Sequence, residues 1–188
     1  MLVLGCMRSA STSVSEALIK ISGIPRHFEP PLPGRVSGYE YYPSSTADII
    51  SKEMLTDWVC SKNYIIQEHL LPIEEHREIL LSIPLEKRKI VILKRDWEDS
   101  FASQVRRNGG KGDCPYKSRT TNKEYCRASF KKFREDLEIF FPEKDGYLHV
   151  EFTELMDNKS KILAKILNYY NINYKKENLI LPHLRRTR

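Results

Sequence analysis

A short stretch near the N-terminus, residues Gly5–Ser13, combines small residues, hydroxyl side chains and one arginine, Arg8. It follows the apolar run Leu2–Leu4 and precedes a segment of helical character, so we expect it to join a strand to a helix. Small residues allow a tight turn, and the N–H groups and dipole at a helix start favour an anion. The stretch therefore predicts an anion site, although a polar turn without a ligand accounts for the same residues.

A second strand-to-helix segment, Lys89–Ser103, carries Arg95 where its apolar run ends. Ser103 lies seven residues after Asp96, and seven steps of 100° return it to nearly the same helical face. We therefore expect Arg95 and Ser103 to face one ligand at the carboxyl edge of a sheet, where α/β folds bind ligands. The plain alternative is a surface arginine and an ordinary helix serine.

The elements that position these residues follow from the apolar pattern. Buried strands of a largely parallel sheet are expected at Leu2–Cys6, Tyr64–Gln67, Lys89–Leu93 and Tyr147–Phe152. Helices are expected at about Thr12–Ser22, Ala47–Cys60, Pro72–Ser82, Trp97–Arg107, Lys123–Phe140 and Lys159–Tyr170. Alternation of strands and helices predicts an α/β fold, a mainly parallel central sheet flanked by helices.

Local signals refine these boundaries. Ser13-Val14-Ser15-Glu16 matches a capping box for the first helix, and Asp96 suits an N-cap. The Pro- and Tyr-rich Pro30–Ser45 and the Gly- and Lys-rich Asn108–Asn122 fit neither period, so we expect functional or mobile irregular loops there.

Length and composition narrow the class of protein. The chain has 188 residues and a mass of 22.0 kDa, which predicts a single domain over residues 1–188. The net charge of +6 suits a polyanionic ligand without demanding nucleic acid. The four cysteines form no CxxC pair, so neither zinc nor a disulfide framework is indicated. With no membrane span or secretory signal in the pattern, we expect a cytoplasmic protein with reduced thiols.

Taken together, these motifs resemble the PAPS-dependent sulfotransferase family, where PAPS is 3′-phosphoadenosine 5′-phosphosulfate. The Arg8–Ser13 loop is similar to the family's 5′-phosphosulfate loop, in particular to the KTASTS form of heparan-sulfate 2-O-sulfotransferases. Arg95 and Ser103 resemble its 3′-phosphate element. Ile65–Pro72 resembles the strand that ends in the catalytic histidine, and Val150–Leu155 resembles the late YEDL segment.

The resemblance implies a P-loop-NTPase-like sulfotransferase fold, PAPS as co-substrate and no metal. His69 is then the leading candidate for the general base, with Glu29 as the alternative, because other branches of the family carry a catalytic Glu just after the first helix. Arg8 is expected to stabilise the leaving phosphate. The residues expected to bind PAPS are Arg8, Ser9, Ala10, Ser11, Thr12, Ser13, Arg95 and Ser103.

Some family features differ in this chain. Ala10 replaces the more usual Gly, and Ser13 replaces an aromatic residue that often stacks near the adenine. The C-terminal RKG element is missing, so we expect Arg185 and Arg186 to supply phosphate contacts in its place.

Two other classes of function compete with sulfuryl transfer. A P-loop kinase or NTPase lacks support because GxxxxGK[ST] is absent. A basic nucleic-acid binder is allowed by the net charge, but no RRM, KH or helix-turn-helix signature is present. The acceptor stays open among a glycan, a lipid headgroup, a small alcohol and a protein tyrosine. The cations around Asn108–Asn122 favour an anionic acceptor if this segment borders the site, and otherwise form a solvated loop.

Overall fold

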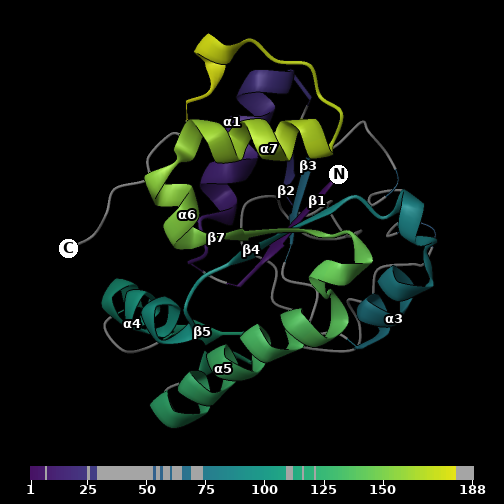
Figure 1. The fold of residues 1–188 in the computed structure, drawn as a ribbon. Coiled ribbons are helices and arrows are strands. Elements are labelled where there is room, and N and C mark those ends of the chain that lie inside the picture. The colour runs from purple at the N-terminus through teal and green to yellow at the C-terminus, as the bar shows by residue number, and fades with distance from the viewer. Residues whose placement is uncertain are drawn as a thin grey trace.

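The computed structural model describes residues 1–6, 8–24, 26–28, 53, 56, 60, 65–68, 74–108, 112–115, 117–120 and 122–180. Only the backbone is described for residues 26–28, 65–68, 74–76, 108, 112–113 and 117–120. Within this part of the chain, a five-stranded parallel sheet lies between two layers of helices (Figure 1). The α/β class and the mainly parallel sheet flanked by helices are thus confirmed.

The sheet is built around the first strand. Its strands are β1 (Leu2–Gly5), β2 (Arg26–Phe28), β3 (Ile65–Glu68), β4 (Ile90–Lys94) and β7 (Leu148–Glu151). Their order is β2-β3-β1-β4-β7, and every neighbouring pair is parallel. All residues of β1 are buried, as a central parallel strand with helices on both faces requires. Each expected strand is present, whereas the short edge strand β2 was not predicted.

The helices match the predicted pattern, except that a short helix over Phe152–Asp157 was not predicted and begins at the residue that was expected to end the preceding strand. They are α1 (Ser11–Ser22), α3 (Glu74–Ser82), α4 (Trp97–Asn108), α5 (Lys123–Phe140), α6 (Phe152–Asp157) and α7 (Lys159–Tyr169). Short 3-10 turns occupy Leu85–Lys87, Glu143–Asp145 and Lys176–Asn178. Of the helix expected over Ala47–Cys60, only Glu53, Thr56 and Cys60 are described, and all are helical.

Alternate residues of the central strands face two separate hydrophobic layers. Leu2, Leu4, Ile90 and Ile92 pack against α5 residues such as Phe130 and Phe133. The intervening strand residues, among them Val3, Val91 and Leu93, pack against α1 and α7. Figure 1 shows α1 and α7 on one side of the sheet and α3, α4 and α5 on the other. The period of two in a strand therefore sets which helices each strand residue meets.

The segment Asn108–Asn122 contains a structure that the sequence did not predict. An antiparallel ribbon forms between β5 (Gly112–Cys114) and β6 (Lys117–Thr120). Cys114 is fully buried in the layer that contains Phe130 and Phe133. Burying this side chain anchors the ribbon to α5, so the expectation of a purely irregular loop was wrong here.

Candidate functional site

The loop after β1 has an unusual backbone. Arg8 has φ 68° and Ala10 has φ 72°, both in the left-handed region that non-glycine residues rarely adopt. Ala10 is the N-cap residue of α1 and has no side chain that can cap the helix. The expected capping box at Ser13–Glu16 was therefore wrong, because α1 already begins at Ser11. Left-handed backbone just before a helix is typical of turns that direct N–H groups towards an anion.

Gly5 lets this loop fold tightly against β4. A Cβ atom at Gly5 would lie 2.5 Å from Ser9 Oγ and 3.1 Å from the carbonyl oxygen of Leu93. Ser9 itself is 1% exposed, and its N–H donates to the carbonyl of Cys6 at 3.1 Å. Glycine is therefore required at position 5 because the Ser9 side chain and the Leu93 backbone leave no room for a Cβ atom, and not because of a special φ angle.

The structure brings the two sequence motifs together. Arg8 Nε donates to Ser103 Oγ at 3.2 Å, and Arg95 Nη1 donates to the carbonyl oxygen of Arg8 at 2.9 Å. Ser103 is 7% exposed, and its hydrogen bond with Arg8 is partly buried. We call Arg8, Ser9, Arg95 and Ser103 the arginine cluster. Arg8 and Ser9 lie in the loop after β1. Arg95 and Ser103 lie more than 80 residues later, just before α4 and within it.

The topology explains why these residues meet. Gly5 and Leu93 are paired in the register of β1 and β4, so the loops that follow the two strands begin side by side. Helix α1 then packs on one face of the sheet, while Trp97 and Phe101 of α4 pack on the other. Neighbouring parallel strands whose helices leave towards opposite faces mark the switch point where α/β folds bind ligands. The arginine cluster lies at this point.

The chemistry of the cluster suits an anionic group. Ser9 Oγ and Arg95 Nε are buried and have no hydrogen-bond partner among the described residues. Burial, and then the positive charges of Arg8 and Arg106, lower the pKa of Arg95 below its usual value, while Asp99 and Asp96 oppose this. The guanidinium of Arg95 therefore lies within the electrostatic influence of Arg8, and its Nε has no acceptor among the described residues. A phosphate or sulfate group can accept from such donors and relieve the repulsion between the two charges.

A second charged network begins at Lys94, the last residue of β4, which directly precedes Arg95. Lys94 Nζ is 2.7 Å from Glu138 Oε1 and 3.7 Å from Glu143 Oε1. Arg134 bonds to Glu138 and, through Nη2, to Glu151 Oε1 at 3.2 Å. These contacts tie the ends of β4 and β7 to α5. Sequence reasoning missed them because nothing local links Lys94 to a partner 44 residues away.

Several predicted site residues lie outside the described residues. These are His69, Glu29, Arg185 and Arg186. Ser11, Thr12 and Ser13 form the first turn of α1, next to the cluster, and Ser11 is buried there. The roles of all these residues remain predictions.

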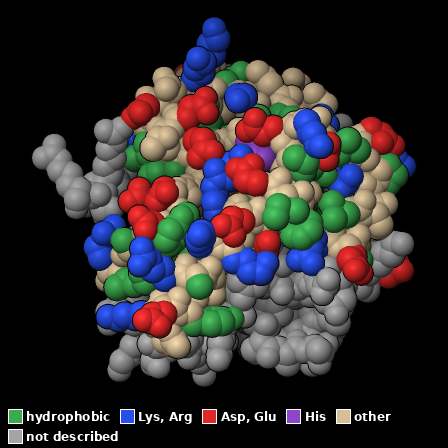
Figure 2. All heavy atoms as spheres, turned by 60° about the horizontal axis from the view of Figure 1, so that its bottom comes forward, with side chains coloured by type: hydrophobic (Ala, Val, Ile, Leu, Met, Phe, Trp, Pro, Cys, Tyr) green, Lys and Arg blue, Asp and Glu red, His purple; other side chains and the backbone are tan. Residues whose placement is uncertain are grey.

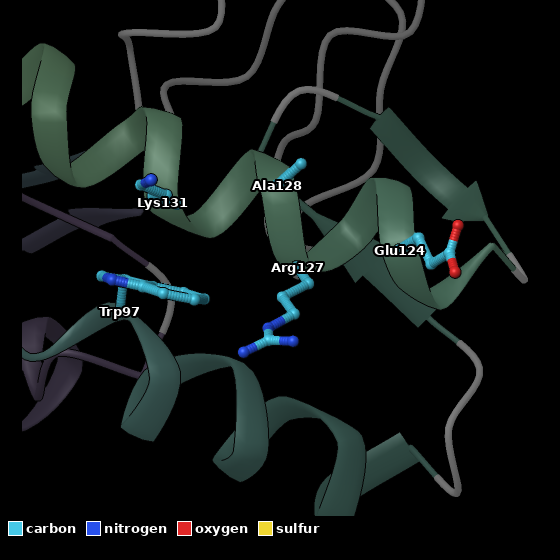
Figure 3. Close-up of a pocket in the computed structure, with 5 residues that line it drawn as sticks. All are labelled: Trp97, Glu124, Arg127, Ala128 and Lys131. Carbon is cyan, nitrogen blue, oxygen red and sulfur yellow. The ribbon is translucent and has the colours of Figure 1, made fainter.

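A separate hollow lies between α4 and α5. It has a volume of about 290 Å³ and is lined by Trp97, Glu124, Arg127, Ala128 and Lys131 (Figure 3). Arg127 stacks 5.5 Å from the Trp97 ring and bonds to Glu98 at 2.8 Å. Six residues separate Trp97 from Ser103, a rotation of about 240°, so the hollow is on another face of α4 than the cluster.

Charge on the face around α3, α4 and α5 is mixed. Lys and Arg side chains alternate with Asp and Glu, and the described residues form no broad patch of one sign on this face (Figure 2). An extended nucleic-acid surface needs clustered cations. The described part of this face does not provide them.

The described residues include neither a helix suited to span a membrane nor a cluster of metal-ligating side chains. Among the described helices, none combines the length and the apolar character that crossing a membrane requires. In the same part of the chain, His, Cys, Asp and Glu side chains form no group of three that could hold a metal ion.

Comparison with known proteins adds no family assignment. No protein-family model matches the chain, and no curated protein matches it either.

Proposed function

We propose that this protein is a sulfotransferase that transfers a sulfuryl group from PAPS to a hydroxyl acceptor. The observation that carries the proposal is the meeting of the two arginine motifs at the switch point of the sheet, through the contacts of Arg8 with Ser103 and Arg95. PAPS has anionic groups at both its 5′ and 3′ positions. Two arginines on neighbouring strand ends suit such a ligand better than a nucleotide with one anionic end.

The order of the strands supports the same proposal. The phosphate-type loop follows the central strand of a β2-β3-β1-β4-β7 sheet, and the helix after it packs on the face opposite α4. A ligand-type loop after a central parallel strand, beside a helix on the opposite face, is compatible with the proposed P-loop-like sulfotransferase fold. The resemblance of Arg8–Ser13 and Arg95–Ser103 to the family's motifs gives the donor its identity.

In the proposed reaction, the acceptor oxygen attacks sulfur and forms a new S–O bond. The S–O bond to the 5′-phosphate breaks, the acceptor proton passes to a general base, and the products are a sulfate ester and 3′-phosphoadenosine 5′-phosphate (PAP). Arg8 and the N-terminal end of α1 stabilise the charge that grows on the leaving phosphate. Arg95 and Ser103 hold the 3′-phosphate and keep the donor in register.

The base is proposed to be His69, with Glu29 as the alternative. A histidine has an ordinary pKa close to neutrality, which suits proton removal from a hydroxyl. His69→Ala should lower turnover by about 10²–10⁴ and leave PAP affinity nearly intact. Glu29→Gln is the parallel test. A variant that folds, binds PAP and turns over at the parental rate excludes its residue as the base.

The acceptor is proposed to be anionic. The β5–β6 ribbon and its flanks carry a run of cations and follow directly after α4, which holds Ser103. Attraction of this kind weakens as salt shortens the Debye length to about 8 Å. Neutralising Lys111, Lys117 and Arg119 together should raise the KM for the acceptor and change PAP affinity less. If the KM for the acceptor changes neither with salt nor with this triple substitution, these cations belong to a solvated loop and do not attract the acceptor.

Thermal-shift measurements with PAP, ADP and ATP test the donor class without knowledge of the acceptor. Ligands that bind the folded state raise the melting temperature by mass action. We expect PAP to stabilise the protein most, with or without Mg²⁺. Stabilisation by ATP and Mg²⁺ with none by PAP supports a kinase or NTPase. Salt-sensitive binding of DNA or RNA without any response to PAP supports a nucleic-acid binder.

A further inference from the structure

Arg95 is partly buried and is held on two sides by contacts. Its Cζ lies 4.3 Å from the centre of the Phe152 ring, and Nη1 donates to the Arg8 carbonyl at 2.9 Å. Its Nε is buried without a hydrogen-bond partner among the described residues. One face of the guanidinium is therefore covered by a ring, and one edge is fixed by backbone.

The register of the sheet places Phe152 at this position. Lys94 and Glu151 are paired at the ends of β4 and β7, so the next residues, Arg95 and Phe152, leave the sheet side by side. Phe152 is also the first residue of α6, which limits the movement of its backbone. The Arg134 bridge to Glu151 and the ion pair of Lys94 with Glu138 fix the two strand ends from the α5 side.

We propose that Phe152 is a positioning residue that holds Arg95 ready for a phosphate at the ribose 3′ position and so sets the preference for 3′-phosphorylated nucleotides. This inference rests on the proposed function. A free arginine side chain samples many rotamers, and ordering it on binding opposes affinity. Stacking on an aromatic ring orders the guanidinium in advance while leaving its donors for the ligand.

The experiment measures affinity for PAP and AMP by calorimetry in Phe152→Leu and Phe152→Tyr. PAP and AMP differ only by the 3′-phosphate, so their ratio reports on Arg95. We expect Phe152→Leu to weaken PAP roughly three- to thirtyfold, the range of a cation–π contact, and to leave AMP within about twofold. Phe152→Tyr keeps the ring and should retain the parental preference.

Phe140→Leu is the matched control. It removes another ring stacked under an arginine, since Arg77 Cζ lies 4.1 Å from the Phe140 ring. We expect no change in the ratio of PAP to AMP affinity. If circular dichroism shows that Phe152→Leu does not fold, Phe152→Met provides the same comparison.

The possible results separate this inference from the proposed function. A selective loss of PAP affinity in Phe152→Leu, restored in Phe152→Tyr, supports the positioning role. Equal losses for PAP and AMP overturn it, because the ring then serves the nucleoside or the fold. If Arg95→Ala loses PAP selectively and Phe152→Leu does not, the positioning role alone is wrong. If Arg95→Ala leaves PAP affinity unchanged, both proposals fail.

Discussion

The buried end of β4 offers an asymmetric test of the charge network beside the arginine cluster. Lys94 is 5% exposed at its side chain, whereas its partner Glu138 is 45% exposed. If Glu138 is replaced by Met, Glu143, at 3.7 Å, is the one acidic partner that Lys94 keeps among the described residues. If Lys94 is replaced by Met, Glu138 is still half in water and still bonded to Arg134. The two single substitutions should therefore differ in their effect on stability.

The magnitudes follow from which charge is left buried. A buried charge that loses its partner typically costs about 3–5 kcal/mol, and replacing a buried ion pair by apolar groups is often near neutral. We expect Glu138→Met to lower the free energy of unfolding by about 3 kcal/mol, since Glu143 compensates only in part. Lys94→Met should cost about 1 kcal/mol or less. The double variant should resemble Lys94→Met, because it leaves no uncompensated lysine.

Urea unfolding and thermal unfolding measure these differences. For a chain of this length, 3 kcal/mol corresponds to a fall in Tm of roughly 6–12 °C. The exposed pair Lys131 and Glu135, with its atoms 3.9 Å apart, is the matched control, and either Met variant there should change stability by about 0.5 kcal/mol or less. If Lys94→Met destabilises as much as Glu138→Met, the argument from burial is refuted.

Two further substitutions test packing and titration. Gly5→Ala should cost about 1–3 kcal/mol in unfolding experiments, because the new methyl lies 3.1 Å from a backbone carbonyl that has little freedom to move. Burial, and then the charge of Lys94, hold the pKa of His149 below its usual 6.5. Unfolding therefore takes up a proton, and stability should fall as the pH drops below about 6.5, by up to about 1.4 kcal/mol per pH unit. His149→Gln should remove that slope.

Clear results would contradict each of these expectations. A parental Tm in Gly5→Ala would show that the loop after β1 has room for a side chain. An unchanged pH dependence in His149→Gln between about pH 5 and 6.5 would show that other groups cause the acid sensitivity. Glu138, whose pKa is also lowered, acts mainly below its ordinary value of 4.5 and so lies outside that window.

The sequence predicted the elements whose signals are local. Apolar runs located β1, β3, β4 and β7, and helix α5 begins and ends where its pattern predicts. Asp96 acts as the expected cap, since its Oδ1 accepts from the N–H of Asp99 at 3.0 Å. The expectation that Arg95 and Ser103 lie at the carboxyl edge of the sheet came from a general rule for α/β folds. Their contacts with Arg8 depend on the pairing of β1 with β4, which the sequence did not predict.

Features that depend on distant partners were not predicted. Strand β2 contains Arg26 and His27 and lies at an edge, so it lacks the apolar run that marks a buried strand. The β5–β6 ribbon is held by Cys114 against α5, a contact invisible in a Gly- and Lys-rich segment. The contact of Phe152 with Arg95 was also not predicted. The position of Phe152 beside Arg95 follows from the register of β4 and β7, which residue patterns alone do not give.

The most direct test of the account is the affinity of the wild-type protein and of Arg95→Ala for PAP and AMP, measured by calorimetry. One charge-assisted contact to phosphate contributes about 1.5–3 kcal/mol, or roughly ten- to a hundredfold in affinity. We expect the wild type to prefer PAP to AMP by at least about tenfold and Arg95→Ala to lose this preference. Arg127→Ala, on α5 and paired with Glu98, should keep it. Equal affinity of the wild type for PAP and AMP, or no binding of PAP, contradicts the assignment of the arginine cluster as a PAPS site.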